Sequence, residues 1–222
     1  MNAPKPLDRP VLFPWVPKAA GTSIWFALEM RRDVTVQRLI HVDRFRAGVD
    51  VATFQHRGLE WLVDRGAITA EWLAGAFVLG WVRNPWARLV SIYTHLVQHE
   101  HSPYRELAAA HGPDFRAFAD WATSGDAPPV GPSMLWGADY ANRQLDWFRY
   151  RGALRCDFWG RVESINEDWP RACEAMGIPR PRRLDRWNAS SHKPYRDYYD
   201  AALRNRAGRY YAAEIERFEY GF

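Results

Sequence analysis

One lysine and two hydroxyl side chains lie close together near the start of the chain. Lys18, Thr22 and Ser23 belong to the stretch VLFPWVPKAAGTSIWFALEM, between an apolar run and a segment with helical spacing. An ammonium group, hydroxyl donors and the unpaired N–H groups of a helix start favour a bound anion such as phosphate or sulfate. We expect a glycine here to let the backbone approach that anion. The predicted anion site comprises Lys18, Ala20, Gly21, Thr22 and Ser23.

A second stretch, GWVRNPWARLVSIY, combines a guanidinium with a hydroxyl. Arg83 follows an apolar run, and Ser91 comes eight residues later, about two turns into the helix that Pro85 is suited to begin. This pair suits a second phosphate, separate from the first. The first stretch is not a nucleotide-hydrolysing loop of the form GxxxxGK[ST], because its lysine precedes Gly21 and no glycine lies five residues earlier.

Apolar runs and helical patterns alternate along the chain. The strands and helices that they predict must position the candidate anion-binding residues. Alternating strands and helices predict an α/β fold, a single domain with a central parallel sheet flanked by helices. A disordered lead-in is expected at 1–10, and the domain at 11–222. The expected strands are 11–16, 34–40, 76–82 and 156–162. The expected helices are 22–32, 57–65, 70–75, one beginning near 85, 114–122, 165–177 and 198–218.

Composition limits the class of protein. The 222 residues are 47% hydrophobic and carry a net charge of +4, which suits an anionic ligand but gives no case for nucleic acid. Two cysteines make no disulfide framework and suggest reduced thiols in a cytoplasmic protein. No apolar run reaches the ~20 residues of a membrane helix. The 12 tryptophans indicate either a tryptophan-rich core or a surface for sugars.

Together the motifs resemble those of the sulfotransferases that use 3′-phosphoadenosine 5′-phosphosulfate (PAPS). PKAAGTSI is similar to their 5′-phosphosulfate loop, and VRNPWARLVSIY to their 3′-phosphate motif. The carbohydrate branch that includes heparan 2-O-sulfotransferases, sulfotransferase family 2, is the better match. FQHRGLEWL, FWGRVESINEDWPRACEAMGI and NASSHKPYRDYY resemble further family segments, so the resemblance runs from about residue 11 to 222. Many relatives carry a histidine two residues before the Pro-Lys pair, where this chain has Trp15.

The resemblance implies a P-loop-like sulfotransferase fold and in-line transfer of a sulfuryl group from PAPS. The acceptor would be a hydroxyl, on a carbohydrate, and PAP (3′-phosphoadenosine 5′-phosphate) the product, with no metal. Lys18 would stabilise the leaving phosphate, which the backbone from Ala20 to Ser23 would also bind. Arg83 and Ser91 would hold the 3′-phosphate, and Ser190 and Lys193 would close over the nucleotide.

His56 is the candidate general base, because a neutral imidazole can take the proton of a sugar hydroxyl. His41 is the second candidate. His95, His99 and His101 lie close together but lack the spacing and the further ligands of a metal site.

Two other functions stay open at this point. A small-molecule kinase would use ATP, although the chain lacks acidic Mg²⁺ ligands after a strand. A non-catalytic module would keep only the nucleotide site. The sequence specifies neither the acceptor nor the oligomeric state.

Overall fold

The computed structural model describes residues 9–29, 36–39, 51–55, 57–98, 114–124, 143–178, 184 and 192–222, with only the backbone for 29, 36–39 and 51–55. The chain divides into two compact units. The first comprises Met1–Val82 and Gln144–Asn188, and the second comprises Arg83–Arg143 and Ala189–Phe222. Most of the expected lead-in lies outside the described residues, and a single domain over 11–222 stays a prediction.

A five-stranded sheet forms the centre of the first unit. Its strands are β1 (Val11–Trp15), β2 (Val36–Leu39), β3 (Val51–Gln55), β4 (Phe77–Val82) and β7 (Phe158–Arg161), in the order β2-β3-β1-β4-β7. Every neighbouring pair is parallel. The carboxyl ends of the strands therefore lie at one edge of the sheet. The predicted α/β fold with a central parallel sheet is confirmed.

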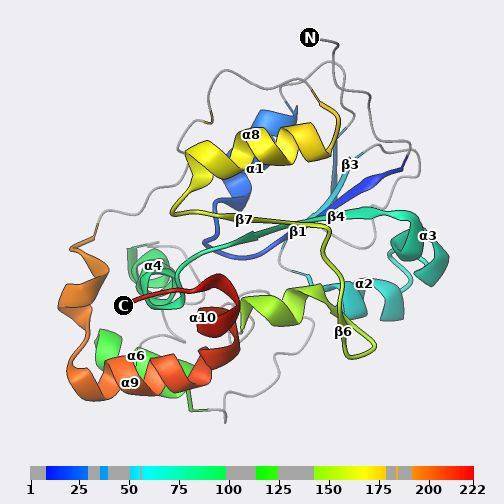
Figure 1. The fold of residues 1–222 in the computed structure, drawn as a ribbon. Coiled ribbons are helices and arrows are strands. Elements are labelled where there is room, and N and C mark those ends of the chain that lie inside the picture. Colours follow the sequence, from blue (N-terminus) through cyan, green and yellow to red (C-terminus); the bar gives the residue numbers. More distant parts are fainter. Residues whose placement is uncertain are drawn as a thin grey trace. The chain divides into compact units, whose positions relative to one another are not determined.

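Helices cover both faces of this sheet (Figure 1). Side chains alternate along a strand, so Leu12 faces one core cluster while Val11 and Phe13 face another. The Leu12 side is covered by α2 (Leu59–Asp64), α3 (Ala70–Gly75) and the 3-10 helix η2 (Gln144–Phe148). The opposite side is covered by α1 (Gly21–Glu29) and α8 (Ile165–Ala175).

Two tryptophans and two glycines alternate across the β4–β7 pair. Gly80 lies opposite Trp159, and Trp81 lies opposite Gly160. A Cβ atom at Gly160 would come within 2.5 Å of the Trp81 ring, and one at Gly80 within 2.8 Å of the Trp159 ring. Each indole thus occupies the space that a cross-strand side chain would need, and each large ring can lie over the glycine of the neighbouring strand.

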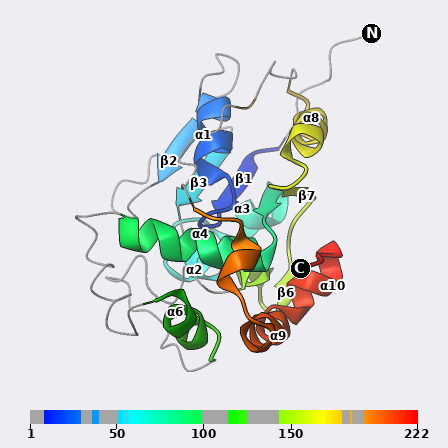
Figure 2. The ribbon, with the colours of Figure 1, turned by 90° about the vertical axis from the view of Figure 1, so that its left-hand side faces the viewer.

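The second unit is helical. It contains α4 (Pro85–Gln98), α6 (Phe115–Ala122), the 3-10 helix η3 (Tyr195–Tyr198), α9 (Ala201–Tyr210) and α10 (Ala212–Phe218). Figure 2 shows η3 passing across α4. Its core is formed mainly by α4, α6 and α9, and includes Leu89, Ile92, Phe118, Leu203 and Ala207.

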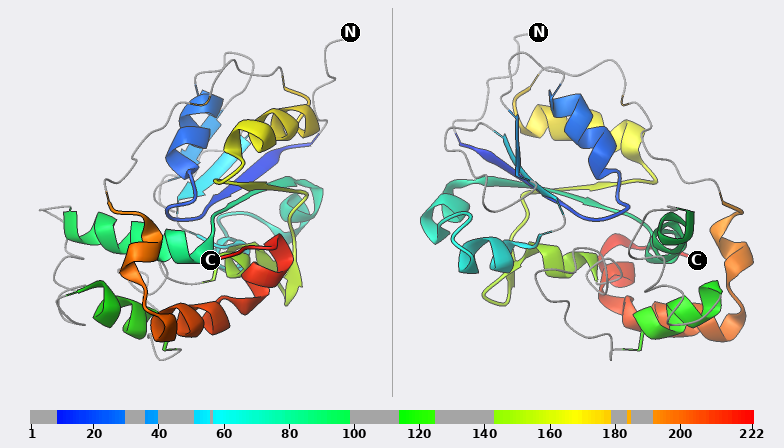
Figure 3. Two further views of the ribbon diagram at one scale, coloured as in Figure 1. Left: turned by 60° about the vertical axis from the view of Figure 1, so that its left-hand side comes forward. Right: turned by 180° about the vertical axis from the view of Figure 1, so that it is seen from behind.

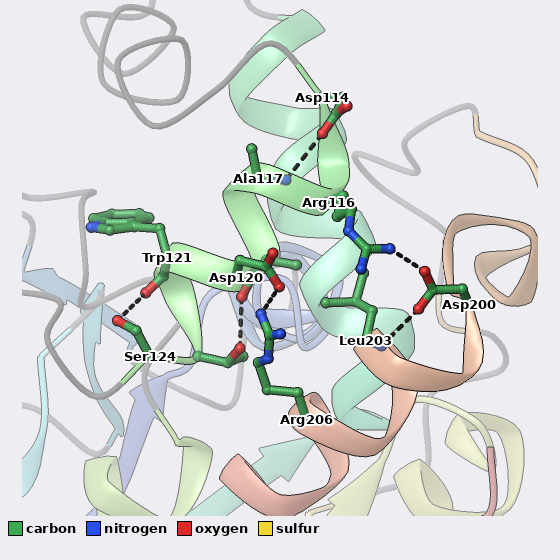
Figure 4. A network of polar contacts seen from close by, with 11 residues as sticks. Asp114, Arg116, Ala117, Asp120, Trp121, Ser124, Asp200, Leu203 and Arg206 are labelled. Atoms are coloured by element: carbon green, nitrogen blue, oxygen red, sulfur yellow. Dashed lines mark hydrogen bonds and ion pairs between the residues drawn. The ribbon is translucent and has the colours of Figure 1, made fainter.

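Two acidic residues cap helices in this unit. The Asp114 carboxylate accepts a hydrogen bond from the Ala117 N–H at the start of α6. Asp200 does the same for Leu203 at the start of α9 and also pairs with Arg116, as Figure 4 shows. The Leu203 N–H and then the Arg116 guanidinium lower the pKa of Asp200. Arg206 pairs with Asp120 and forms a second link between α6 and α9.

Several elements differ from the prediction. The strand β3 was not predicted, because VATFQ is short and lacks a clear alternation of apolar residues. The hairpin of β5 (Arg149–Tyr150) and β6 (Ala153–Leu154) was also missed. The expected helix over 198–218 was wrong as one element, because Tyr211 leaves helical geometry and separates α9 from α10, visible in Figure 3.

Two residues with polar side chains, Tyr211 and Glu214, are buried at the bend between α9 and α10. The Tyr211 side chain is 1% exposed and the Glu214 side chain is fully buried. Burial raises the pKa of the Tyr211 hydroxyl, which therefore stays protonated. Across the part of the chain that the structure describes, no helix combines the length and apolar character needed to cross a membrane.

Candidate anion site at the sheet edge

Lys18 lies in a tight turn that leaves β1. The Ala19 N–H donates to the Val16 carbonyl at 3.4 Å, which closes a four-residue turn. Pro17 and Lys18 are its central residues, and Lys18 has φ 61°. Proline followed by a residue with positive φ is the pattern of a type II turn, whose third position normally holds glycine. The sequence thus places a charged residue at a position where glycine would adopt the positive φ with less strain.

Ala20 repeats this feature two residues later, with φ 60°. A left-handed conformation costs a non-glycine residue about 1–2 kcal/mol, and such outliers gather at functional sites. Lys18 and Ala20 were both predicted to bind the anion. That role stays a prediction.

The helix α1 begins directly after this turn. The Ile24 N–H donates to the Ala20 carbonyl at 3.1 Å. The N–H groups of Gly21, Thr22 and Ser23 therefore precede the first helical hydrogen bond and lie at the positive end of the helix. Thr22 is half-buried and Ser23 is 6% exposed. The predicted anion residues thus form one continuous backbone segment around the head of α1.

Gly21 is required by a contact that the sequence did not reveal. A Cβ atom at Gly21 would lie 1.9 Å from the Trp15 indole Nε1. Trp15 is 4% exposed and stacks on Trp25, with ring centroids 6.3 Å apart. Close approach of a ligand is therefore not the only reason for glycine here. Trp15, noted in the sequence only as a departure from the family, is part of the site.

We expect Gly21→Ala to destabilise the protein by about 1–3 kcal/mol, because the buried Trp15 ring has to move. Denaturant unfolding measures the change. Gly75→Ala is the matched control, since a methyl group there meets nothing within 4 Å, and alanine is the better helix former. Equal stability of the two variants would contradict the packing of Trp15 on Gly21.

β3 ends at the same edge of the sheet as β1. Gln55, the last residue of β3, lies opposite Trp15, the last residue of β1, in a parallel pair. The carboxyl ends of β1 and β3 therefore lie side by side, and Lys18 follows the end of β1. His56 itself lies outside the described residues, as do His41 and Ser190.

Arg83 directly precedes the cap of α4, in the second unit. The Asn84 side-chain oxygen accepts hydrogen bonds from the Trp86 N–H at 3.1 Å and from the Ala87 N–H at 3.2 Å. Pro85 occupies the first helical position, as predicted. Arg83 is half-buried, and Ser91 is 1% exposed inside the helix. Both predicted 3′-phosphate residues thus belong to one rigidly capped helix and its entry.

Lys193 is exposed before η3, in the second unit. The neighbouring His192 ring nitrogen Nδ1 lies 2.7 Å from the Lys193 carbonyl oxygen.

Among the described residues, no three His, Cys, Asp or Glu side chains gather in a way that could hold a metal ion. Of the three clustered histidines, His99 and His101 lie outside the described residues.

Most tryptophans that the structure describes serve the core. Six have an exposed fraction of 7% or less: Trp15, Trp25, Trp81, Trp86, Trp147 and Trp169. These residues fill the spaces beside the sheet and along α4. The high tryptophan content therefore reflects mainly packing, and by itself it gives little reason to expect a sugar-binding surface.

The first unit defines the class of protein: a parallel α/β protein with a tight turn of positive φ between its first strand and first helix. The family model of the sulfotransferase family matches residues 8–221, so the chain belongs to the sulfotransferase family. The crystal structure of mouse sulfotransferase SULT7A1 complexed with PAP is similar in fold. Its TM-score is 0.57 at 12% identity, over 96% of this chain and 85% of that chain. No curated protein matches the sequence.

These findings confirm the predicted family, the sulfotransferase fold and the assignment as a sulfotransferase enzyme. They leave the kinase alternative without support. The family match extends over residues of both compact units. The roles of the individual site residues stay predictions.

Proposed function

We propose that this chain transfers a sulfuryl group from PAPS to a hydroxyl of a carbohydrate acceptor, and releases PAP. The observation that carries the proposal is the strained lysine turn at the head of α1 in a member of the sulfotransferase family. The structural neighbour SULT7A1 was crystallised with PAP, which supports PAP as the product here. Cys156 and Cys173 form no disulfide with each other, which agrees with a proposed cytoplasmic location.

The proposed chemistry needs positive charge at the leaving group. As the sulfur–oxygen bond to the donor breaks, negative charge grows on the 5′-phosphate of PAP. The Lys18 ammonium and the first N–H groups of α1 are the groups that would stabilise it. These groups supply the neutralisation in the proposed reaction, so no metal ion takes part in it.

The 3′-phosphate is assigned to Arg83 and Ser91 in this proposal. β1 and β4 are parallel neighbours, so the chain leaves both strands at one edge, toward Lys18 and toward Arg83. Ligands of open α/β sheets bind at the carboxyl ends of the strands, and the assignment of both motifs to one nucleotide rests on their resemblance to the family motifs. Ser190 and Lys193 are proposed to close over it, and residues 11–222 to work as one domain.

His56 is proposed as the base that takes the proton of the acceptor hydroxyl. Its support is the register of β3, which ends at Gln55 opposite Trp15 and so directs the chain toward the Lys18 edge. The carbohydrate acceptor rests on the resemblance of the motifs to the carbohydrate branch of the family, since the buried tryptophans give little further support.

We expect Arg83→Ala to weaken the binding of PAP by ~10- to 100-fold, because a charged phosphate contact is worth ~1.5–3 kcal/mol. Adenosine 5′-monophosphate (AMP), which lacks the 3′-phosphate, should lose far less. Isothermal titration of both nucleotides measures the difference. Equal weakening of both would remove Arg83 from the 3′-phosphate site.

The acceptor is tested by incubating the protein with ³⁵S-labelled PAPS and separate panels of glycans, phenols and cell extract. The proposal expects label on a glycan and one PAP released for each sulfate transferred. Label found only on phenols would replace the carbohydrate by another acceptor. A protein that binds PAP but labels no acceptor in any panel would favour the non-catalytic module.

A further inference from the structure

The last residues of the sequence are bonded to the cap of α4. Asn84 uses its side-chain oxygen to cap the helix, and its Nδ2 group donates to the Gly221 carbonyl at 2.8 Å. Asn84 is 7% exposed, so this hydrogen bond is shielded from water. A single amide side chain thus joins the segment Gly221–Phe222 to the helix start that follows Arg83.

The Phe222 ring is held by aromatic side chains from two other elements. Its centroid lies 5.5 Å from that of Trp86 in the first turn of α4, at an interplanar angle of 85°. The centroids of Tyr195 and Tyr199 are each 5.6 Å away, again edge to face. Such edge-to-face pairs are favourable beyond the area they bury.

Two guanidinium groups complete the anchorage of Phe222. The Arg196 Nη2 group donates to the Phe222 carbonyl at 3.0 Å. The guanidinium carbons of Arg196 and Arg204 lie 5.9 and 5.4 Å from the centre of the ring, within the range of a cation–π interaction. The position of Phe222 is therefore fixed by its backbone as well as by its ring.

Two hydrogen bonds hold Trp86 itself in place. Its Nε1 group donates to the Arg204 carbonyl at 3.0 Å, and its carbonyl accepts from the Tyr199 hydroxyl at 3.0 Å. Burial raises the pKa of Tyr199, so its hydroxyl stays protonated and remains a donor. The first turn of α4 is thus held by Tyr199, directly after η3, by α9 and by the segment Gly221–Phe222.

We propose that Gly221 and Phe222 position Arg83 for the 3′-phosphate by fixing Asn84 and the first turn of α4. They act as positioning residues and do not touch the nucleotide. This inference rests on the proposed assignment of Arg83. Gly221 lies 138 residues after Arg83 in the sequence. The inference predicts that disturbing the segment Gly221–Phe222 selectively reduces the preference for a nucleotide that carries the 3′-phosphate.

Two variants of the full chain test the inference. Phe222→Ala removes the ring. Asn84→Ser keeps a capping oxygen, since serine ranks with asparagine as a cap, but removes the amide that donates to Gly221. Phe118→Leu is the control, because Phe118 is a buried core residue whose ring packs at a tilt against Tyr93 in the middle of α4. It disturbs the same unit without altering the first turn of that helix.

The readout is the ratio of the dissociation constants of AMP and PAP, with the melting temperature measured in parallel. We expect this ratio to fall roughly tenfold in Phe222→Ala and Asn84→Ser, a loss of the size of one weakened contact to a charged group, and to stay unchanged in Phe118→Leu. An unchanged ratio in the first two variants, with a normal preference in the unaltered protein, would overturn the positioning role alone. An unaltered protein without preference for PAP over AMP would overturn the assignment of Arg83, and the inference with it.

Discussion

Replacing Lys18 by alanine is expected to lower kcat by ~10²–10³-fold, the usual effect of removing a group that stabilises developing charge. The loss should appear mainly in kcat and only weakly in the KM for PAPS, because charge on the 5′-phosphate grows as the sulfur–oxygen bond breaks. Initial rates of PAP release at varied PAPS concentrations measure both constants. A variant with normal kcat would remove Lys18 from the chemical step.

Two further variants separate charge from folding. Lys18→Gly should lose kcat like Lys18→Ala while being the more stable protein, because glycine accepts the positive φ of the turn without strain. Arg151→Ala is the control, since Arg151 is also a cation with positive φ, 49°, although it is exposed whereas Lys18 is half-buried. Arg151 lies in the β5–β6 turn. The Arg151→Ala variant should keep normal kcat. A similar loss in Arg151→Ala would mean that general charge, not the position of Lys18, matters.

Replacing His56 by alanine is expected to reduce turnover by ~10²–10⁴-fold, the range of general-base catalysis. PAP affinity and stability should change little, because the base acts on the acceptor and not on the nucleotide. Single-turnover transfer to the acceptor, together with PAP titration, measures the two effects. Normal turnover in this variant would show that another group is the base.

The pH profile tests the same role. Imidazole has an ordinary pKa of about 6.5 and must be neutral to accept a proton. Activity should therefore rise with pH through this region in the unaltered protein, and His56→Ala should lack the rising limb. His41→Ala is the comparison, because His41 is the second candidate. A rising limb lost in His41→Ala but kept in His56→Ala would transfer the role to His41.

The elements with strong local signals were predictable from the sequence. The continuous apolar run at 76–82 became β4 (Phe77–Val82), and Pro85 begins α4 as expected. α3 has the predicted bounds, and Thr69 caps it through a hydrogen bond from the Trp72 N–H. In each case neighbouring residues alone determine the outcome, through burial, a fixed φ or a cap.

Features that depend on distant residues were not predictable. β3 is a strand because it pairs with both β1 and β2, which its own residues do not reveal. The break at Tyr211 buries a tyrosine and a glutamate inside the second unit. Trp15 lies on Gly21 only because the turn at Lys18 returns the chain to the end of β1.

In the candidate site, too, features set by neighbouring residues were predictable and features set by distant residues were not. The motif predicted which residues form the turn and the head of α1, and it predicted that α4 begins after Arg83. It did not predict the left-handed backbone of Lys18 and Ala20, since neither residue type favours it. Nor did it predict the hydrogen bond from Asn84 to Gly221, which joins two segments far apart in the sequence.

The central claim is that the chain binds PAP without a metal ion, and thermal unfolding with added ligand tests it most directly. PAP is titrated in buffer containing EDTA, and ATP is titrated separately with Mg²⁺. A ligand that binds only the folded chain stabilises it by ~2.7 kcal/mol at a hundredfold excess over Kd. The account predicts a rise in Tm with PAP in the absence of any metal ion, and little or none with ATP–Mg²⁺. Stabilisation by ATP–Mg²⁺ without any response to PAP would contradict it.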